Sequence, residues 1–213
     1  MLVVFSDIHL TDESTAINVN PEAFTKILLK EIELWAVKNE AKEIIIVLNG
    51  DILDFVRTDY WLKIDRSERP WNGILDKKTA MNNNTDLMEF HYGKLLDEII
   101  KTNSSKAFLS MLNSISRKFG DKIPVKVCYV TGNHDRILNT SPALKEKILG
   151  LLSSYESDNV SFANEFTDAS QYSVLCRHGH EWDNANYGLE LFKYLNSADD
   201  FITGFHRDIY KLQ

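Results

Sequence analysis

Residues of the kinds that bind metal ions directly follow short apolar runs at four places in the chain. The four segments are Ser6-Asp7-Ile8-His9, Asn49-Gly50-Asp51-Ile52-Leu53-Asp54, Thr131-Gly132-Asn133-His134-Asp135 and His178-Gly179-His180-Glu181. Their carboxylate, amide and imidazole groups suit manganese, iron or zinc. In open α/β sheets, ligands bind outside the carboxyl ends of the strands, so we expect the four segments to meet at one sheet edge. The sequence therefore predicts a metal site built by loops.

Gly132-Asn133-His134-Asp135 is the most specific of these segments. Asp-x-His, as in Asp7-x-His9, is so short that it often arises by chance, whereas four defined residues directly after an apolar run seldom do. A single aspartate or histidine at a loop tip is usually a solvated residue or a cap. That explanation fits any one of these residues but not the ordered set, which favours a shared chemical function.

The order of these motifs resembles that of the calcineurin-like metallophosphoesterase superfamily. The motifs are Asp7-x-His9, Gly50-Asp51-x-x-Asp54, Gly132-Asn133-His134-Asp135 and then His178. The resemblance implies an α/β fold (α+β, four-layer) in which a β-sandwich is flanked by helices. It also implies two divalent metal ions at one edge of the sandwich, with manganese as the first choice and iron or zinc as alternatives.

The resemblance also implies a role for each metal ligand. Asp7 and His9 are expected to bind the first metal ion, and Asn133 and His178 the second. Asp51 is expected to bridge both ions, for which a carboxylate has the two oxygens needed. The neutral amide oxygen of Asn133 would keep its metal ion acidic.

By the same resemblance, His134 is the catalytic histidine and Asp54 orients it. The chemistry fits these residue types independently, because two cations about 3.5–4 Å apart bind phosphoryl oxygens and lower the pKa of a bridging water. The resulting hydroxide attacks phosphorus, and a histidine with a carboxylate partner can protonate the leaving oxygen. We therefore expect metal-dependent hydrolysis of a phosphomonoester, a phosphodiester or a nucleotide pyrophosphate.

Three further residues near the motifs are candidates for contact with the substrate or support of the ligands. Arg57 and Arg136 lie close in sequence to the motifs and could contact a phosphate group. The alternative for both is a solvated surface arginine. His180 lies two residues past His178, where it would touch substrate, support a ligand or serve only the local structure.

One motif of the superfamily is missing from the sequence. The superfamily usually completes its site with a later Gly-His-x-His, whereas the only histidine here after His180 is His206, in Thr203-Gly204-Phe205-His206. We expect the full protein to continue beyond Gln213 and to supply these ligands, so that this chain is its amino-terminal part. The alternative is a catalytically impaired member that keeps the fold as a binding or scaffold module.

Two other function classes are disfavoured. Protein serine/threonine phosphatases of the superfamily place arginine after the second aspartate of the Gly-Asp motif, whereas Asp54 is followed by Phe55. A nuclease remains an alternative, but the net charge of −7 argues against a general electrostatic grip on nucleic acid. The expected partner is therefore a phosphorylated small molecule or a phosphodiester substrate.

Strands are predicted before each of the site segments. The predicted strands cover residues 2–5, 43–48, 125–130, 159–163 and 171–177, and the continuous β-branched run in 43–48 suits a parallel sheet covered on both faces. Helical spacing predicts helices from Pro21, over 87–99, over 108–119, after Ser141-Pro142 and over Tyr187–Leu195. We interpret residues 57–86 as an irregular insertion over the mouth of the site, within a longer inserted and helical segment, 57–123.

Composition predicts one globular domain over residues 1–213. The chain is 44% hydrophobic and 26% charged, which supports a packed core and excludes wholesale disorder. No apolar run reaches the roughly 18 residues of a transmembrane helix, and the N-terminus does not resemble a signal peptide. The two cysteines, Cys128 and Cys176, lie in apolar runs, so we expect buried thiols and a cytoplasmic protein.

Overall fold

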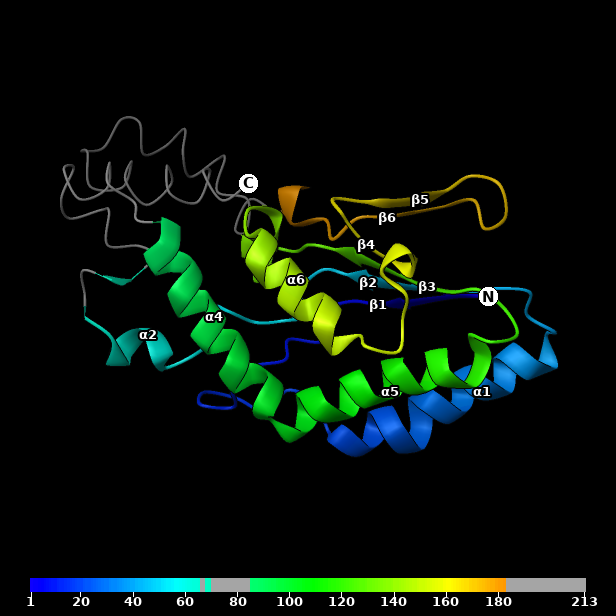
Figure 1. The fold of residues 1–213 in the computed structure, drawn as a ribbon, viewed down its shortest axis with the longest axis horizontal. Helices are drawn as coiled ribbons and strands as arrows, with labels where there is room; N and C mark the ends of the chain where they lie inside the picture. The colour runs from blue at the N-terminus through cyan, green and yellow to red at the C-terminus, as the bar shows by residue number, and fades with distance from the viewer. Residues whose placement is uncertain (66–67, 70–84, 183–213) are drawn as a thin grey trace.

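The computed structural model describes residues 1–65, 68–69 and 85–182, and at its centre lies a parallel sheet of four strands. The strands are β1 (Leu2–Phe5), β2 (Ile44–Asn49), β3 (Val125–Val130) and β4 (Val160–Ala163), adjacent in that order (Figure 1). Phe5 pairs with Leu48, and Leu48 with Tyr129, so the three strands β1, β2 and β3 end at nearly the same level. The loops that follow them therefore start side by side.

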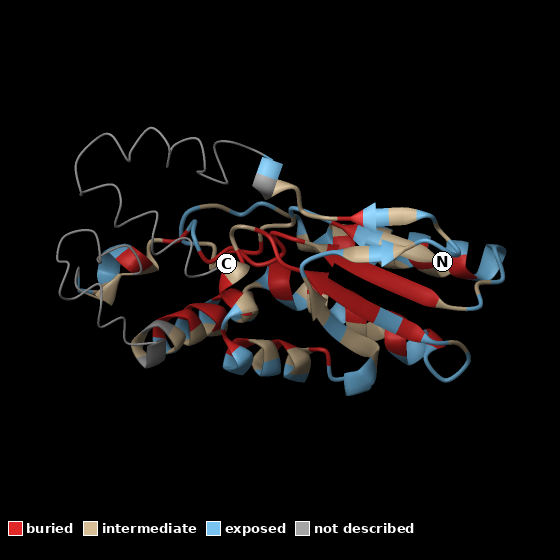
Figure 2. Ribbon diagram, turned by 90° about the horizontal axis from the view of Figure 1, so that it is seen from above, coloured by how far each residue is buried: buried red, intermediate tan, exposed pale blue. Residues whose placement is uncertain are grey.

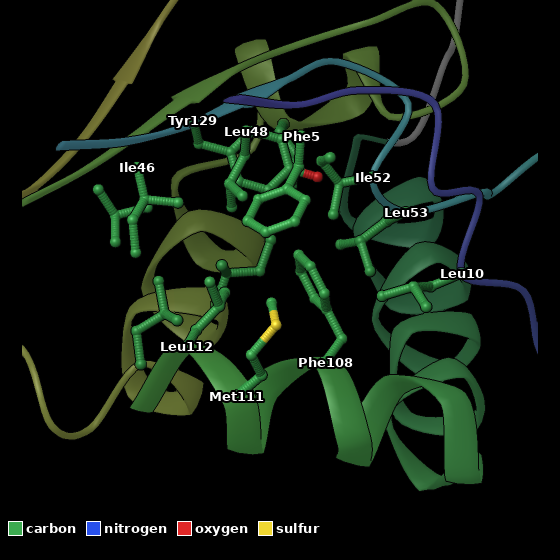
Figure 3. Packing of buried hydrophobic residues seen from close by; sticks show 14 of the residues in the cluster. Phe5, Leu10, Ile46, Leu48, Ile52, Leu53, Phe108, Met111, Leu112 and Tyr129 are labelled. Atoms are coloured by element: carbon green, nitrogen blue, oxygen red, sulfur yellow. The ribbon is translucent and has the colours of Figure 1, made fainter. Parts of the chain in front are cut away.

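Helices cover one face of this sheet. They are η1 (Ala23–Leu28), α1 (Leu29–Lys38), α4 (Thr85–Lys101), α5 (Asn103–Phe119) and α6 (Pro142–Leu151). Figure 3 shows Phe108, Met111 and Leu112 reaching from α5 to the sheet residues Ile46 and Leu48. Buried residues concentrate in the central strands and on the helix faces turned toward them (Figure 2). This apolar core anchors the sheet edge at which the loops begin.

A second, two-stranded antiparallel sheet covers the opposite face. It consists of β5 (Phe166–Asp168) and β6 (Val174–Cys176) and lies along the sheet face away from α1 and α5 (Figure 1). A small apolar cluster joins the two sheets; its buried members are Ile45, Val47, Cys128, Val130 and Cys176. The described residues thus build three layers: helices, the parallel sheet and the second sheet, in agreement with the expected sandwich. The outer helical layer of the expected four is not found among them.

Local sequence signals explain where the described helices begin. Thr102 and Ser141 act as N-caps, since their side chains accept hydrogen bonds from the backbone N–H groups of Ser105 and Leu144. Pro142 occupies the first turn of α6, where its missing N–H is harmless. The helix predicted from Pro21 is confirmed, although its first part, η1, has the wider π-helical geometry.

The strands after β4 require one correction and one addition to the sequence predictions. The strand predicted over 171–177 is shorter, Val174–Cys176, and belongs to the second sheet rather than to the parallel one. Strand β5 was not predicted, because three residues are too few to show an alternating pattern.

The segment 57–123 contains regular structure that the sequence only partly indicated. A short helix, α2 (Tyr60–Lys63), buries Trp61, and the indole N–H donates to the Phe55 carbonyl at 2.8 Å. Leu95 and Ile99 of α4 are fully buried in the main core, so this helix is part of the domain's packing. Residues 70–84, the predicted helix over Tyr187–Leu195, and His206 lie outside the described residues. Within the described part, no helix has the length and apolarity needed to cross a membrane.

Candidate metal centre

The loops after β1 and β2 adopt an uncommon backbone conformation. The φ angles of Asp7, His9 and Asp51 are 56°, 50° and 52°, and that of Gly50 is 80°. Non-glycine residues seldom occupy this left-handed region. Those that do are often found at functional sites, where contacts with the surrounding structure hold the strained backbone in place. Here the contacts come from the paired loops, because Asp7 N–H donates to the Gly50 carbonyl at 3.1 Å and His9 N–H to the Asp51 carbonyl at 2.8 Å.

Two glycines allow the loops to approach one another closely. A Cβ atom on Gly132 would lie 2.2 Å from Oδ1 of Asp51, and one on Gly50 would lie 2.4 Å from the ring of His178. Both distances are far shorter than van der Waals contact, so any side chain would push the loops apart. The glycines of the two motifs are therefore needed for the geometry of the site.

These loops line a cavity of about 490 Å³ that is open to solvent at the carboxyl edge of the parallel sheet. It is lined by Asp7, His9, Asp51, Arg57, Asn133, His134, His178, Gly179 and His180. All the residues expected to bind metal ions are in this group, although they span most of the described chain. Asp54 is fully buried and contacts two of the lining histidines.

Three of the lining histidines lie close to one oxygen of Asp51. Oδ2 lies 3.3 Å from Nε2 of His178, 3.7 Å from Nε2 of His9 and 3.9 Å from Nε2 of His134. Burial by itself would lower the pKa of His178, but the hydrogen bond to Asp51, the charges of Asp51 and Asp7 and the contact with the Asn49 carbonyl together outweigh it and raise that pKa to about 9. Burial would likewise raise the pKa of Asp51, yet the hydrogen bonds from His178 and from the His134 backbone leave it below its ordinary value.

Asp54 orients two histidines, not one. Its Oδ1 lies 2.9 Å from Nδ1 of His134 and its Oδ2 lies 3.0 Å from Nδ1 of His9. It also accepts from the backbone N–H of Val56 at 3.0 Å, the N–H of Arg57 at 2.8 Å and Nε of Arg57 at 2.6 Å. Burial would raise the pKa of Asp54, but the hydrogen bonds from His134 and Arg57 hold it well below its usual range. An ionised Asp54 thus holds Nδ1 of both rings and leaves each Nε2 directed toward Asp51.

The donor set fits a metal ion among Asp7, His9 and Asp51, and a further pair of donor atoms lies in the same cavity. Ligand atoms of Asp7, His9 and Asp51 lie within 4.8 Å of one another, and Nε2 of His178 lies 3.1 Å from Oδ1 of Asn133. Metal-binding histidines usually donate the other ring N–H to a carboxylate or a carbonyl. Asp54 fills this place for His9, and the Asn49 carbonyl, 3.2 Å from Nδ1, fills it for His178.

A third grouping, His9, Asp54 and His134, also has ligand atoms within 4.8 Å of one another. It is a poor metal site because both Asp54 oxygens already accept hydrogen bonds from backbone and guanidinium donors. His134 therefore differs from His9, since only His9 also belongs to a grouping with Asp7 and Asp51.

Asn49 is a residue of this site that the sequence did not single out. It ends β2, and its side-chain Nδ2 donates to the Arg177 carbonyl at 3.1 Å while its own carbonyl faces Nδ1 of His178. Asn49 therefore connects the parallel sheet to the loop after β6 and brings His178 into the cavity. No local sequence pattern identifies this contact, because Asn49 and Arg177 are 128 residues apart and meet only when the two sheets pack together.

The remaining candidates divide between the cavity and the layer beneath it. Arg57 and His180 line the cavity, and the ring of His180 lies 5.4 Å from that of His178. Arg136 lies in η4 (Arg136–Asn139), is partly buried and does not line the cavity. Asp135, the last residue of the Gly132-Asn133-His134-Asp135 motif, is fully buried, and burial raises its pKa to about 6.

Comparison with known proteins gave one match, to a protein family. A family model described as calcineurin-like phosphoesterase matches residues 1–211. A search of curated proteins found no match, and a search of solved structures found none either.

Proposed function

Since the chain belongs to the calcineurin-like phosphoesterase family, we propose that it hydrolyses phosphoric esters with the help of two divalent metal ions. The observation that carries this proposal is the convergence of imidazole nitrogens on one oxygen of Asp51, at 3.3 to 3.9 Å. The substrate would be a phosphomonoester, a phosphodiester or a nucleotide pyrophosphate.

The proposed ligand sets are those that the family resemblance implies, and the lining of the cavity supports them. Asp7, His9 and Asp51 would hold one ion, and Asn133, His178 and Asp51 the other, with manganese as the first choice and iron or zinc as alternatives. Asp51 would be shared by both ions; its Oδ1 accepts the His134 backbone N–H at 2.8 Å, and its Oδ2 lies near the imidazole rings. When bound, two such ions supply Lewis acidity toward phosphoryl oxygens and lower the pKa of a water between them.

His134 is proposed to protonate the leaving oxygen. Burial would lower the pKa of His134, but the hydrogen bond to Asp54 and the charges of Asp54 and Asp51 together outweigh it and raise the pKa above its ordinary value. Nδ1 is committed to Asp54, so the proton to be transferred would be held at Nε2, which faces the cavity. Asp54 would fix the ring and stabilise its charged form.

Arg57 and His180 are proposed to contact the phosphate or the leaving group. Arg57 is half-exposed in the cavity, and its Nε is bound to Asp54, so its terminal nitrogens are held near the site. Guanidinium groups bind phosphate oxygens in a planar, directional manner. Arg136 lies outside the cavity lining, and we assign it no contact with substrate.

The main alternative is a catalytically impaired member of the family. The ligand sets proposed above give each ion three side chains from the described residues, which would leave its affinity low.

A cytoplasmic location is also proposed, because Cys128 and Cys176 are buried free thiols, as expected in a reducing compartment.

Turnover of two chromogenic substrates tests the proposal. Protein stripped of metal by a chelator is expected to hydrolyse p-nitrophenyl phosphate or bis(p-nitrophenyl) phosphate only after manganese is restored. Asp51→Asn is the control for the site, because it removes the shared charge and should abolish both metal binding and turnover. Manganese binding without turnover of either substrate would support the impaired alternative.

A further inference from the structure

Asp135 is a fully buried carboxylate that lies beneath the cavity without lining it. Its Oδ1 accepts the backbone N–H of Gly132 at 2.6 Å. Its Oδ2 accepts the backbone N–H of Ile52 at 3.0 Å and the hydroxyl of Tyr129 at 2.7 Å. A carboxylate is expensive to bury unless such donors satisfy it. Tyr129 belongs to β3 and Gly132 to the loop that follows it, whereas Ile52 belongs to the loop after β2, so Asp135 connects these two loops.

Asp51 makes the opposite connection. It belongs to the loop after β2, and its Oδ1 accepts the backbone N–H of His134 from the loop after β3 at 2.8 Å. The two aspartates therefore form a reciprocal clasp, in which Asp51 binds the backbone beside Asp135 and Asp135 binds the backbone beside Asp51. Gly132 lies between them, with no room for a side chain.

The clasp determines which Asp51 oxygen faces the cavity. Oδ1 is held by the His134 N–H, so Oδ2 is the oxygen that lies near the imidazole rings. Asp51 also has a φ of 52°, a conformation that costs on the order of 1–3 kcal/mol and needs support from its surroundings. The bond from Ile52 N–H to Asp135 supports the peptide that directly follows Asp51.

We propose that Asp135 is a positioning residue: it holds the loops after β2 and β3 in register and so aims Oδ2 of Asp51 at the metal ligands. The proposal rests on the proposed function in taking this cavity to be the metal site. Asp135 itself touches neither the cavity nor the reacting groups, so it acts only through Asp51 and the two loops.

The test compares manganese affinity, measured by calorimetry, between variants. Asp135→Asn replaces an acceptor oxygen by an NH₂ group that faces backbone N–H donors, so the clasp should loosen. Loss of a residue that orients metal ligands typically weakens metal binding about 10- to 100-fold, and we expect a manganese Kd raised by that factor. Tyr129→Phe removes one hydrogen bond and leaves both loop contacts, so its Kd should change by about threefold or less.

Asn113→Ala is the matched control for a purely structural role. Asn113 also connects its own element, α5, to a distant segment, since its side chain donates to the Leu151 carbonyl at 2.9 Å and accepts from Ser154 N–H at 3.1 Å. It does not line the cavity, so its loss should lower Tm and leave the manganese Kd unchanged. Exchange of the Ile52 and Gly132 amide hydrogens in the metal-free protein should quicken in Asp135→Asn and stay unchanged in Asn113→Ala.

Two results would overturn the proposal. One is an Asp135→Asn protein that binds manganese as tightly as the wild type below the Tm of both. The other is an Asn113→Ala protein that loses affinity to the same extent, which would mean that general instability explains the effect. Failure of the proposed function is distinguishable, because it would appear as wild-type protein that binds manganese but turns over no phosphoric ester.

Discussion

Replacing His134 with asparagine separates proton transfer from metal binding at this site. The change removes a ring whose Nδ1 lies 2.9 Å from Asp54 and whose Nε2 faces the cavity. General acid catalysis is usually worth about 10²–10⁴ in rate. At 1.36 kcal/mol for each factor of ten, this corresponds to about 3–5 kcal/mol of transition-state stabilisation. We expect kcat to fall by that factor for substrates with alkyl leaving groups, while the manganese content stays near that of the wild type.

His9→Asn is the matched control, because the two histidines have nearly the same surroundings. Their side chains are 17% and 19% exposed, and both rings place Nδ1 within 3.0 Å of Asp54. The structural consequences of the two substitutions should therefore be similar. Only His9 shares a grouping with Asp7 and Asp51, so only His9→Asn should lose metal.

The assay is a rate measurement on two leaving groups combined with metal analysis of each variant. The effect of His134→Asn should shrink for p-nitrophenolate, which leaves with little protonation. The wild-type rate should depend on a protonated group, and this dependence should be absent from the pH profile of the variant. If His134→Asn empties the site and excess manganese restores full activity, then His134 is a metal ligand and the role assigned to it is wrong.

Three further predictions concern the groups around Asp51. Asp54→Asn should lower both activity and manganese affinity about 10- to 100-fold, because it loosens His9 and His134 together; an effect on activity alone, in calorimetry and rate assays, would contradict the shared role. Gly132→Ala should lower Tm and manganese affinity, because the new methyl group would lie 2.2 Å from Oδ1 of Asp51, whereas Gly150→Ala, which meets nothing within 4 Å, should do neither. The pKa of His178 is raised to about 9, above the ordinary value of about 6.5, so its stabilisation of the metal-free protein should be complete below pH 6.5 and lost as the pH rises through 9. Tm measured from pH 6 to 10 should therefore fall in the wild type relative to His178→Gln, and parallel curves would contradict the assignment.

Part of this site could be predicted because its chemistry is local in sequence. Asp7, Asp51 and Asn133 each follow an apolar run, and parallel strands end at a common edge, so order and spacing alone bring them together. The same apolar runs, with the caps at Thr102 and Ser141, account for the strands and helices of the main core. The family resemblance rested on these local motifs, and the family match over residues 1–211 agrees with it.

Other parts depended on contacts between residues far apart in the chain. The second sheet, and with it the route by which His178 reaches the cavity, rests on packing between β6 and the face of β2 and β3. Asn49 donates to the Arg177 carbonyl, and Gly50 leaves space for the His178 ring. No local sequence pattern marks either residue for these contacts. Such close approach is set by the positions of two packed sheets, which a one-dimensional pattern does not contain.

The sequence therefore determines which candidate groups are present, while the folded chain determines which partner each of them contacts. Residue types, their order and the family resemblance were enough to predict that Asp51, Asp54 and His134 belong to one site. Only the tertiary structure assigned Oδ1 of Asp51 to a backbone N–H and Oδ2 to the imidazoles, and made Asp54 the partner of two rings. Hydrogen bonds depend on distances of tenths of an ångström between loops, and those distances exist only after the core has packed.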